Sequence, residues 1–323
     1  MQDIVVYDDG VVAVDSGYGD RSRLAAVHLV VDNGRVAVID TATNASLPHI
    51  LAMLARLNIP PEAVDWVILT HLHLDHAGGA GSMMCALPRA QLVAHPLGRR
   101  YLVEPTLLWE RSVELYGAER TFRFYGCLIP VDGSRIVDAW DGQELSLGER
   151  TLRLLAAPGH SRDHIVVWDE VAQAFFTGDA FGVSYRELDA DGREFIFPST
   201  SPHQFEPDDM LATIERMLAF CPQAMYLSRF GRVREVARLG VDLYRLIHAH
   251  IAVAQAARGE GVARHVDILS GLEQLVREEC ARQQWGLDEE AALELLRLDL
   301  AFNAQGLGMW LDDCQRSQSA VAA

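Results

Sequence analysis

Residues 70–79 read Thr70-His71-Leu72-His73-Leu74-Asp75-His76-Ala77-Gly78-Gly79, a stretch that holds three histidines and one aspartate within six positions. It directly follows residues 64–69, an apolar and β-branched run that is typical of a buried strand. Side chains alternate along extended backbone, so His71 and His73 are expected to point to the same side. Asp75 and His76 come after a turn and are expected to face a second point nearby. The stretch therefore predicts ligands for one metal ion or for two adjacent ions.

The alternative is that these histidines are ordinary polar residues at a surface turn. The chain has only twelve histidines among 323 residues, and three of them fall in this one short stretch. Clustering of this kind after a buried strand favours a metal site. Neutral imidazole and carboxylate suit zinc, iron and manganese, so we expect one or two Zn²⁺ ions per chain, with Fe or Mn as the alternatives.

Length and composition limit the classes of protein to consider. With 323 residues, 50% of them hydrophobic, the chain can form one large domain or two, with a sizeable core. It has 45 Asp and Glu against 28 Lys and Arg, and the resulting net charge of −17 argues against a binding track for nucleic-acid phosphates. We expect a small-molecule substrate, no nucleic-acid or membrane partner, and leave a homodimer open.

The cysteines and the N-terminus bear on the compartment. The cysteines number five and lie far apart, without a Cys-x-x-Cys pair, so reduced thiols fit better than a disulfide framework or a structural zinc knot. Residues 1–9 lack the basic start and apolar run of a signal peptide. No stretch approaches the roughly 18 uninterrupted apolar residues of a membrane span. We therefore expect a soluble, cytoplasmic protein.

Hydrophobic periodicity and turn signals predict strands that alternate with helices over residues 1–231. Residues 4–7 and 11–14 form a predicted hairpin, and residues 25–31 and 35–39 form another around Asn33-Gly34, a strong hairpin signal. Further strands are predicted at 64–69, 91–94, 135–137, 144–147, 151–155, 165–168, 174–176 and 224–227, and helices at 47–57, across 96–118 and at 207–220. Two βα halves stacked into a sandwich with helices outside would account for this order.

After Gly231 the pattern changes. Three amphipathic helices are expected in the remaining chain, without a strand, and the acidic run Asp288-Glu289-Glu290 suits the start of the third. We therefore divide the chain into an α/β domain, residues 1–231, and an all-α C-terminal extension, residues 232–323.

Two later junctions between predicted strands carry more polar residues than a turn requires. Residues 157–164 read Ala-Pro-Gly-His-Ser-Arg-Asp-His and contain His160, and residues 177–180 read Thr-Gly-Asp-Ala and contain Asp179. Taken alone, these are a polar loop histidine and a turn aspartate. Each follows an apolar strand, however, as the first cluster does, so we expect both to join it at the metal site.

The pattern His-x-His-x-Asp-His, followed by His160 and Asp179, resembles the signature of the metallo-β-lactamase fold superfamily over roughly residues 1–230. The resemblance implies a four-layer αβ/βα sandwich with two metals at its mouth. By this match His71, His73 and His160 hold the first metal, Asp75 and His76 belong to the second, and Asp179 bridges the two. The sequence of the loop after Asp179 and that of the C-terminal helices resemble an uncharacterised bacterial, metallo-hydrolase-like subgroup of this fold.

One position departs from the family pattern. The loop after the strand at 224–227 usually supplies a further histidine to the second metal, and here it reads Ser228-Arg229-Phe230. Arginine stays protonated and cannot coordinate a dication, so the second site is weakened, empty, or completed by another group such as His203 or water. Arg229 is expected either to bind an anionic group of the substrate or to form a salt bridge with Asp75 or Asp179.

Other residues are expected to surround the site. Asp40 ends a strand and is predicted to orient a ligand imidazole, and His164 is assigned a structural role. Tyr185 and His203 lie in the long loop after Asp179 and are candidates for substrate contact, with core or loop packing at least as compatible. His248 and His250 point in different directions on a helix and are read as structural.

These residues predict a metal-dependent hydrolase in which Asp75 orients metal-bound water and takes its proton. An ester, a thioester, a lactone or a phosphodiester is the expected substrate. Two alternatives stay open: a mononuclear non-haem iron oxidoreductase resembling the persulfide dioxygenases of this fold, with His71, His160 and Asp179 as its ligands, and a metal-binding regulator without turnover.

Overall fold

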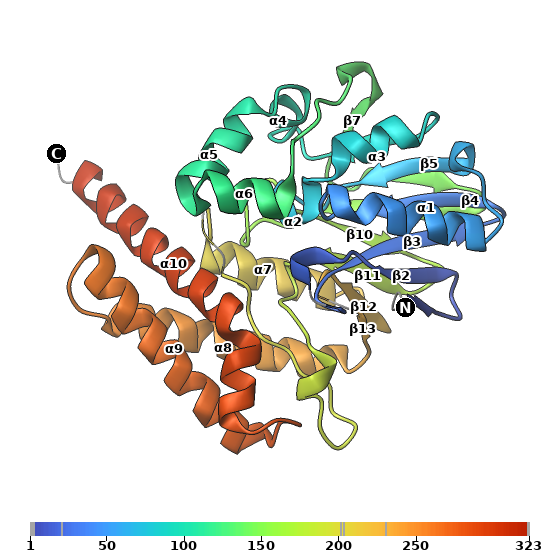
Figure 1. The fold of residues 1–323 in the computed structure, drawn as a ribbon. Helices are drawn as coiled ribbons and strands as arrows, with labels where there is room; N and C mark the ends of the chain where they lie inside the picture. The colour runs from blue at the N-terminus through green and yellow to red at the C-terminus, as the bar shows by residue number, and fades with distance from the viewer. Residues whose placement is uncertain (1–3, 21, 201, 203, 230, 322–323) are drawn as a thin grey trace. The chain divides into compact units, whose positions relative to one another are not determined.

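The computed structural model describes residues 4–20, 22–200, 202, 204–229 and 231–321 (Figure 1). The chain forms two compact units. The first consists of Met1–Ala156, Asp163–Gly178 and Pro222–Arg232, and the second of Ala157–Arg162, Asp179–Cys221 and Val233–Ala323. The domain boundary predicted at residue 231 stays a prediction.

The first unit contains a seven-stranded sheet in the order β1-β2-β3-β4-β5-β6-β7. Its strands are antiparallel from β1 to β4 and parallel from β4 to β7. Both predicted hairpins are confirmed, and Asn33 and Gly34 have positive φ angles of 47° and 75°, as a tight two-residue turn requires. The strands are β1 Ile4–Val6, β2 Val11–Asp15, β3 Ala26–Asp32, β4 Arg35–Ile39, β5 Val64–Ile68, β6 Gln91–Ala94 and β7 Ile136–Asp138.

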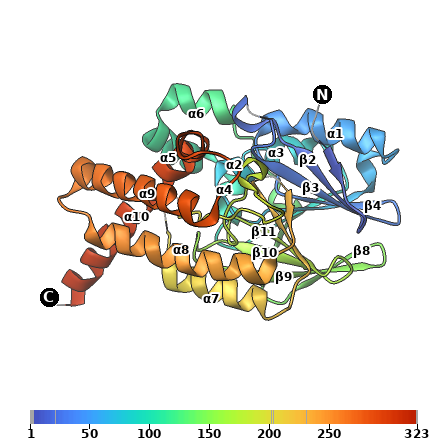
Figure 2. The same ribbon diagram turned by 90° about the horizontal axis from the view of Figure 1, so that it is seen from below.

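The second sheet has the order β13-β12-β11-β10-β9-β8 and belongs almost wholly to the first unit. Figure 2 shows β8 to β11 of this sheet. Its strands are β8 Glu144–Leu147, β9 Arg150–Ala156, β10 Ile165–Asp169, β11 Ala174–Gly178, β12 Ala224–Leu227 and β13 Gly231–Val233. Strand β13 corrects the expectation that no strand follows Gly231. Three residues are too few to show an alternating pattern, so only pairing within the sheet reveals this strand.

Alternation along the strands separates two apolar layers in the first unit. On β4, Ala37 and Ile39 face the core between the two sheets, where they join residues such as Val167 and Phe176. Val36 and Val38 face the other way, into the core beneath α1 and α3. Figure 1 shows these two helices along the same face of the first sheet. The helices of this unit are α1 Leu47–Arg56, α2 Leu74–Ala77, α3 Ala80–Ala86, α4 Arg99–Val103, α5 Thr106–Tyr116 and α6 Ala118–Tyr125.

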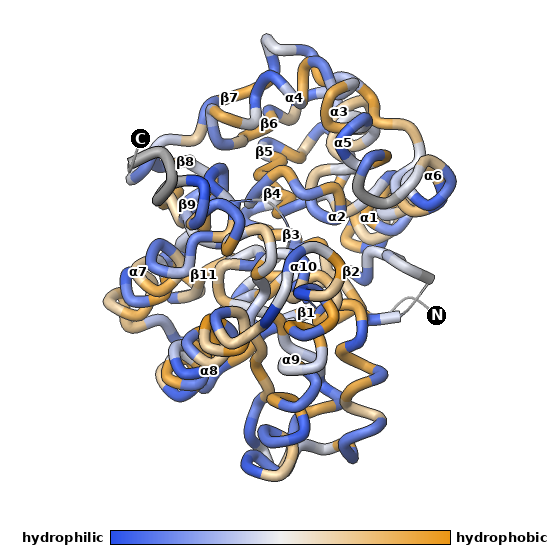
Figure 3. Tube along the Cα trace, turned by 90° about the vertical axis from the view of Figure 1, so that its left-hand side faces the viewer, coloured by the Kyte–Doolittle hydropathy of each residue, from blue (hydrophilic) through white to orange (hydrophobic). Residues whose placement is uncertain are grey.

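The second unit is largely helical. It contains α7 Pro207–Leu218, α8 Val236–Ala256, α9 Gly261–Gln283 and α10 Glu289–Val321. The three predicted C-terminal helices are confirmed, and Asp288 accepts a hydrogen bond of 2.9 Å from the backbone N–H of Ala291 at the start of the third. Apolar and polar residues alternate along α8 and α9 (Figure 3), and several of the apolar residues, among them Leu243 and Leu272, are fully buried.

None of the helices that the structure describes combines the length and the apolar character of a membrane span.

Candidate metal centre

Four residues of the predicted site lie together in the first unit, just past the end of β5. His71 and His73 lie in the segment between β5 and α2, outside regular secondary structure, and Asp75 and His76 lie in the short helix α2, for which His73 is the N-cap. As predicted, the first two histidines face a common point, because Nε2 of His71 lies 2.9 Å from Nδ1 of His73. The ring of His76 lies 4.1 Å from that of His71, measured between centroids. This unit alone therefore gathers three imidazoles and a carboxylate.

Two neighbouring side chains decide which ring nitrogen of each histidine carries the proton. Asp40, which is buried, accepts hydrogen bonds from the hydroxyl of Thr70 at 2.9 Å and from Nδ1 of His76 at 2.9 Å. Since the only hydroxyl proton of Thr70 goes to Asp40, its oxygen accepts from Nδ1 of His71 at 3.1 Å. His71 and His76 therefore both present Nε2 as the nitrogen with a lone pair. The predicted orienting role of Asp40 agrees with its bond to His76.

The pairing of nitrogens between His71 and His73 bears on whether these residues fit a metal. Two imidazole nitrogens 2.9 Å apart need a shared proton or a cation to offset the repulsion of their lone pairs. Histidines that bind metal characteristically donate their other N–H to a carboxylate, a carbonyl or another fixed acceptor. The donor set and its supporting bonds fit a divalent metal of the zinc, iron or manganese type.

Arg229 lies in the first unit beyond β12 and forms an ion pair with Asp75 through Nη2 and Oδ2. Only 11% of the arginine side chain and 16% of the aspartate side chain are exposed. The guanidinium carbon also lies 6.0 Å from the centre of the Tyr18 ring, and the Tyr18 hydroxyl is 3.2 Å from that of Tyr125. Burial, with the charge of Asp75 as a smaller cause, raises the pKa of Tyr18 to about 12. Of the two expectations for Arg229, the salt bridge to Asp75 is present.

His164, Asp163 and Gly178 pack against the segment that carries His71 and His73. His164 is fully buried and stacks on His71, with ring centroids 4.7 Å apart. Asp163 accepts a 2.9 Å hydrogen bond from the backbone N–H of Leu72. Gly178 has a φ of 49°, and a Cβ there would meet the Thr70 hydroxyl at 2.6 Å and His164 Nε2 at 2.8 Å. Only glycine fits at this position, one residue before Asp179.

His160 and Asp179 lie together in the second unit, and both are buried. Nδ1 of His160 donates to the carbonyl of Ser199 at 2.9 Å, so this histidine also presents Nε2, which lies 3.6 Å from Oδ2 of Asp179. The hydroxyl of Ser199 donates to the same carboxylate oxygen at 3.3 Å. One serine thus supports both of the predicted ligands in this unit.

Asn303 on α10 holds the backbone on either side of Ser199. It accepts from the N–H of Thr200 at 2.8 Å and donates to the carbonyl of Pro198 at 2.8 Å. Its amide nitrogen lies 3.4 Å from Nε2 of His250, whose Nδ1 donates to the carbonyl of Leu246. Thr70, Ser199 and Asn303 were not predicted from the sequence. The one signal for Asn303 is a polar residue among the buried apolar residues Leu300, Ala304 and Leu307 of the same helix.

The two candidate substrate residues in the long loop differ in outcome. Tyr185 is 2% exposed, and its hydroxyl donates to Asp299 on α10 at 2.9 Å. This burial agrees with the alternative that Tyr185 packs in the core or loop, and its contact with substrate stays a prediction. His203 lies outside the described residues.

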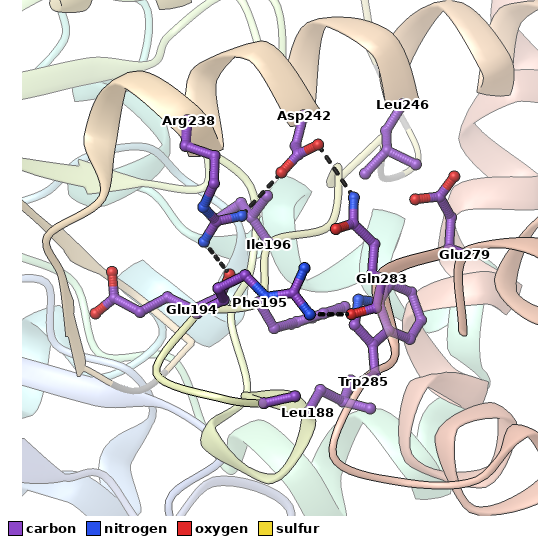
Figure 4. Close-up of a pocket in the computed structure, with 12 residues that line it drawn as sticks. Leu188, Glu194, Phe195, Ile196, Arg238, Asp242, Leu246, Glu279, Gln283 and Trp285 are labelled. Carbon is purple, nitrogen blue, oxygen red and sulfur yellow. Dashed lines mark hydrogen bonds and ion pairs between the residues drawn. The ribbon is translucent and has the colours of Figure 1, made fainter. Parts of the chain in front are cut away.

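A small pocket in the second unit is lined by charged side chains that are bonded to one another (Figure 4). Arg238 is hydrogen-bonded to Asp242 and to the carbonyl of Glu194, and Arg193 donates to the carbonyl of Gln283. This network ties the segment around Glu194 to α8 and to the end of α9.

Comparison with known proteins identifies the family. Residues 20–220 match the family model described as the metallo-beta-lactamase superfamily. The chain belongs to this superfamily. The predicted family and fold class are therefore confirmed: a mixed α/β fold with two sheets, outer helices and a helical C-terminal region.

Three relatives illustrate the range of this superfamily. The chain is 21% identical to the metallo-beta-lactamase fold-containing protein ST1585 of Sulfurisphaera tokodaii over 226 residues, or 69% of this chain and 79% of that protein. The solved structure of ST1585 matches 81% of this chain and 94% of that one, with a TM-score of 0.60.

Acyl-coenzyme A thioesterase MBLAC2 of Gallus gallus is 30% identical over 176 residues, which cover 53% of this chain and 62% of the relative. The structure of the peroxy diiron species of the chemotaxis sensor ODP matches 75% of this chain and 94% of that one, with a TM-score of 0.54 and 14% identity. At such identities the solved structures establish the fold of this chain, and its activity has to be inferred from its own residues.

Proposed function

We propose that this protein is a metal-dependent hydrolase that acts on thioesters. The observation that carries the proposal is shared by His71 and His160. Each has Nδ1 bonded to another group of the protein, a threonine oxygen and a carbonyl, and each presents Nε2. His250, a structural histidine of the same chain, instead has both of its nitrogens engaged by Leu246 and Asn303. The first arrangement is characteristic of metal ligands.

We propose His71, His73 and His160 as the ligands of this metal, with Asp179 beside them. Chain connectivity supports this grouping. Asp179 is bonded directly to Gly178, the last residue of β11, and His160 lies in the six residues that join Ala156 at the end of β9 to Asp163. Membership of the superfamily, whose motifs these residues match, supports it further.

A bound divalent metal would lower the pKa of a coordinated water and polarise the carbonyl that the water attacks. The chain itself contributes orientation and proton transfer. Asp75 holds the attacking water and accepts its proton, and its ion pair with Arg229 fixes the carboxylate in one rotamer. Thr70, whose hydroxyl is held by Asp40, and Ser199 keep the proton on Nδ1 of His71 and His160, so that Nε2 of each keeps its lone pair for the metal.

A thioester is the substrate class that the relatives favour. MBLAC2 is named an acyl-coenzyme A thioesterase and is 30% identical over the matched region. Oxygen esters, lactones and phosphodiesters are the comparison substrates. The solved ODP structure is that of a peroxy diiron species, which favours a second candidate for this chain, an iron-dependent redox protein.

The test uses the full chain purified without chelator. Metal content is measured first. Release of free thiol from short- and long-chain acyl-coenzyme A is then followed against the matched oxygen esters, before chelation, after chelation, and after return of zinc, iron or manganese. We expect thiol release that chelation abolishes and one metal restores. His71→Ala should lose it, whereas His248→Ala, at an exposed histidine on α8, should not.

Failure of every metal-loaded form to cleave any thioester would overturn the proposal. Oxygen consumption with a persulfide by the iron form, without hydrolysis, would favour the redox candidate instead.

A further inference from the structure

The ion pair of Arg229 engages Asp75, a residue that the family resemblance assigns to a second metal. Oδ2 of Asp75 is bonded to Nη2 of Arg229 and lies 3.7 Å from Nε2 of His76. Asp75 and His76 are the two ligands that the first unit offers to a second ion. A carboxylate oxygen already bonded to a guanidinium is a poor ligand for a dication, because the two cations compete for the same lone pairs.

Arg229 is held at this position from two directions. The carboxylate binds its edge, and the half-buried ring of Tyr18 lies 6.0 Å from its guanidinium carbon, within the range of a cation–π contact. The hydroxyl of Tyr18 is in turn placed by Tyr125. Because arginine keeps its proton at every pH at which proteins fold, its charge cannot be removed to admit a metal.

The charged and polar groups around Asp75 and His76 are paired with one another without a second metal. Asp40 binds Nδ1 of His76, Nε2 of His76 lies near Asp75, and Asp75 binds Arg229. In a two-metal site the second dication would neutralise Asp75. Here the guanidinium does so, with one positive charge in place of two and with no open coordination position.

We propose that this protein binds one metal ion per chain, and that the guanidinium of Arg229 takes the place of the second. The inference rests on the proposed function only in that a metal binds at the histidine cluster. It corrects what the family resemblance implied, namely two metals with Asp75 and His76 as ligands of the second. His76 then supports the site through Asp40 and does not need to bind an ion.

The experiment counts metal ions without reference to activity. The wild-type chain and three variants are depleted of metal, dialysed against a moderate excess of free Zn²⁺ or Co²⁺, and analysed for metal per chain. Arg229→His removes the charge and adds an imidazole. Arg229→Lys keeps the charge. Arg232→His makes the same change as the first at an arginine that pairs with Asp8 and Asp9 instead.

We expect one ion per chain in the wild type, in Arg229→Lys and in Arg232→His, and two in Arg229→His. The visible spectrum of Co²⁺ should saturate at one equivalent in the first three and at two in the last. Two ions in the wild type, or one in an Arg229→His variant with wild-type circular dichroism, would overturn the inference.

These outcomes separate the two proposals. One ion without thioester cleavage removes the proposed substrate and leaves the one-metal site in place. Two ions per chain together with thioester cleavage removes the one-metal site and leaves the proposed substrate in place. A chain that binds no metal at all removes both.

Discussion

His76 in the first unit and His160 in the second are oriented by the same kind of bond but depend on different parts of the chain. His76 donates to the carboxylate of Asp40, 36 residues away, at the end of a strand in the core of the sheet. His160 donates to the backbone carbonyl of Ser199. The peptides on either side of Ser199 are held by Asn303, which lies 103 residues after Thr200 in the chain. The first support is a charged side chain on a sheet, and the second is a loop held by a distant helix.

Because of this difference, the two halves of the site are expected to respond differently to mutation. Asp40 has a positive φ of 61°, a conformation in which aspartate and asparagine are tolerated and most other side chains are strained. Its support of His76 is a direct hydrogen bond to a charged side chain. The support of His160 passes through three hydrogen bonds, so the loss of one is expected to cost less.

The largest effect is expected for His71, because its ring contacts both His73 and His76. His71→Ala should lower thioester hydrolysis roughly a thousandfold or more, since a catalytic metal supplies several kcal/mol of transition-state stabilisation. Metal content and kcat/KM measured on the same preparation would check this. His164→Gln tests the stacked neighbour, which we expect to retain its metal. Full metal content in His71→Ala would remove His71 from the site.

The next effect concerns Asp40. Asp40→Asn keeps the backbone conformation accessible but removes the charged acceptor of the Thr70 hydroxyl, whose oxygen in turn accepts from Nδ1 of the proposed ligand His71. We expect metal affinity to fall by about 10- to 100-fold, the usual cost of losing such a partner. Competition with a chromophoric chelator measures it. If the affinity is unchanged, the first unit does not depend on this carboxylate and the contrast with the second unit is wrong.

A third effect compares the buried histidines of the two units. Burial lowers the pKa of His28 to about 3 and that of His250 to about 4. Unfolding returns the pKa of both histidines to the ordinary value near 6.5. Below that pH the unfolded chain binds protons that the native chain does not, so the free energy of unfolding decreases as the pH is lowered. The loss runs from about pH 6.5 down to the native pKa, at up to about 1.4 kcal/mol per pH unit for each histidine.

His250→Gln should therefore shrink the difference between the free energies of unfolding at pH 6.5 and pH 5 by about 2 kcal/mol. His28→Gln should do the same for the first unit. Urea unfolding at both pH values gives the comparison. A difference that is the same in wild type and variant would mean that the histidine is solvated or protonated in the native protein.

The smallest effect is expected for Asn303. Asn303→Ala leaves the N–H of Thr200 and the carbonyl of Pro198 without this partner. Stability should fall by about 1–3 kcal/mol, and metal affinity by less than tenfold, because Ser199 can still reach His160. Asn303→Asp is the matched control, since it keeps the acceptor for Thr200. If Asn303→Ala weakens metal binding more than Asp40→Asn does, the second unit provides the stronger support.

Local pattern predicted much of this structure. The hairpins, the strand before His71 and the three C-terminal helices follow from periodicity and turn residues, which act over a few positions. His160 and Asp179 stand out because each lies in a polar junction that follows an apolar strand. Strand β13 was missed because three residues carry no period, and Ser199 was missed because it acts through its backbone carbonyl, which every residue has.

The sequence by itself determined the family, the two-sheet fold and the residue types of the candidate metal centre, because these depend on alternation, helical spacing and a short motif. Only the tertiary structure decided which nitrogen each histidine presents, that Arg229 is paired with Asp75, and that Asn303 supports the loop of Ser199. These outcomes depend on groups brought together from 30 to 154 positions apart, and hydrogen bonds and ion pairs at such separations leave no periodic trace in the chain.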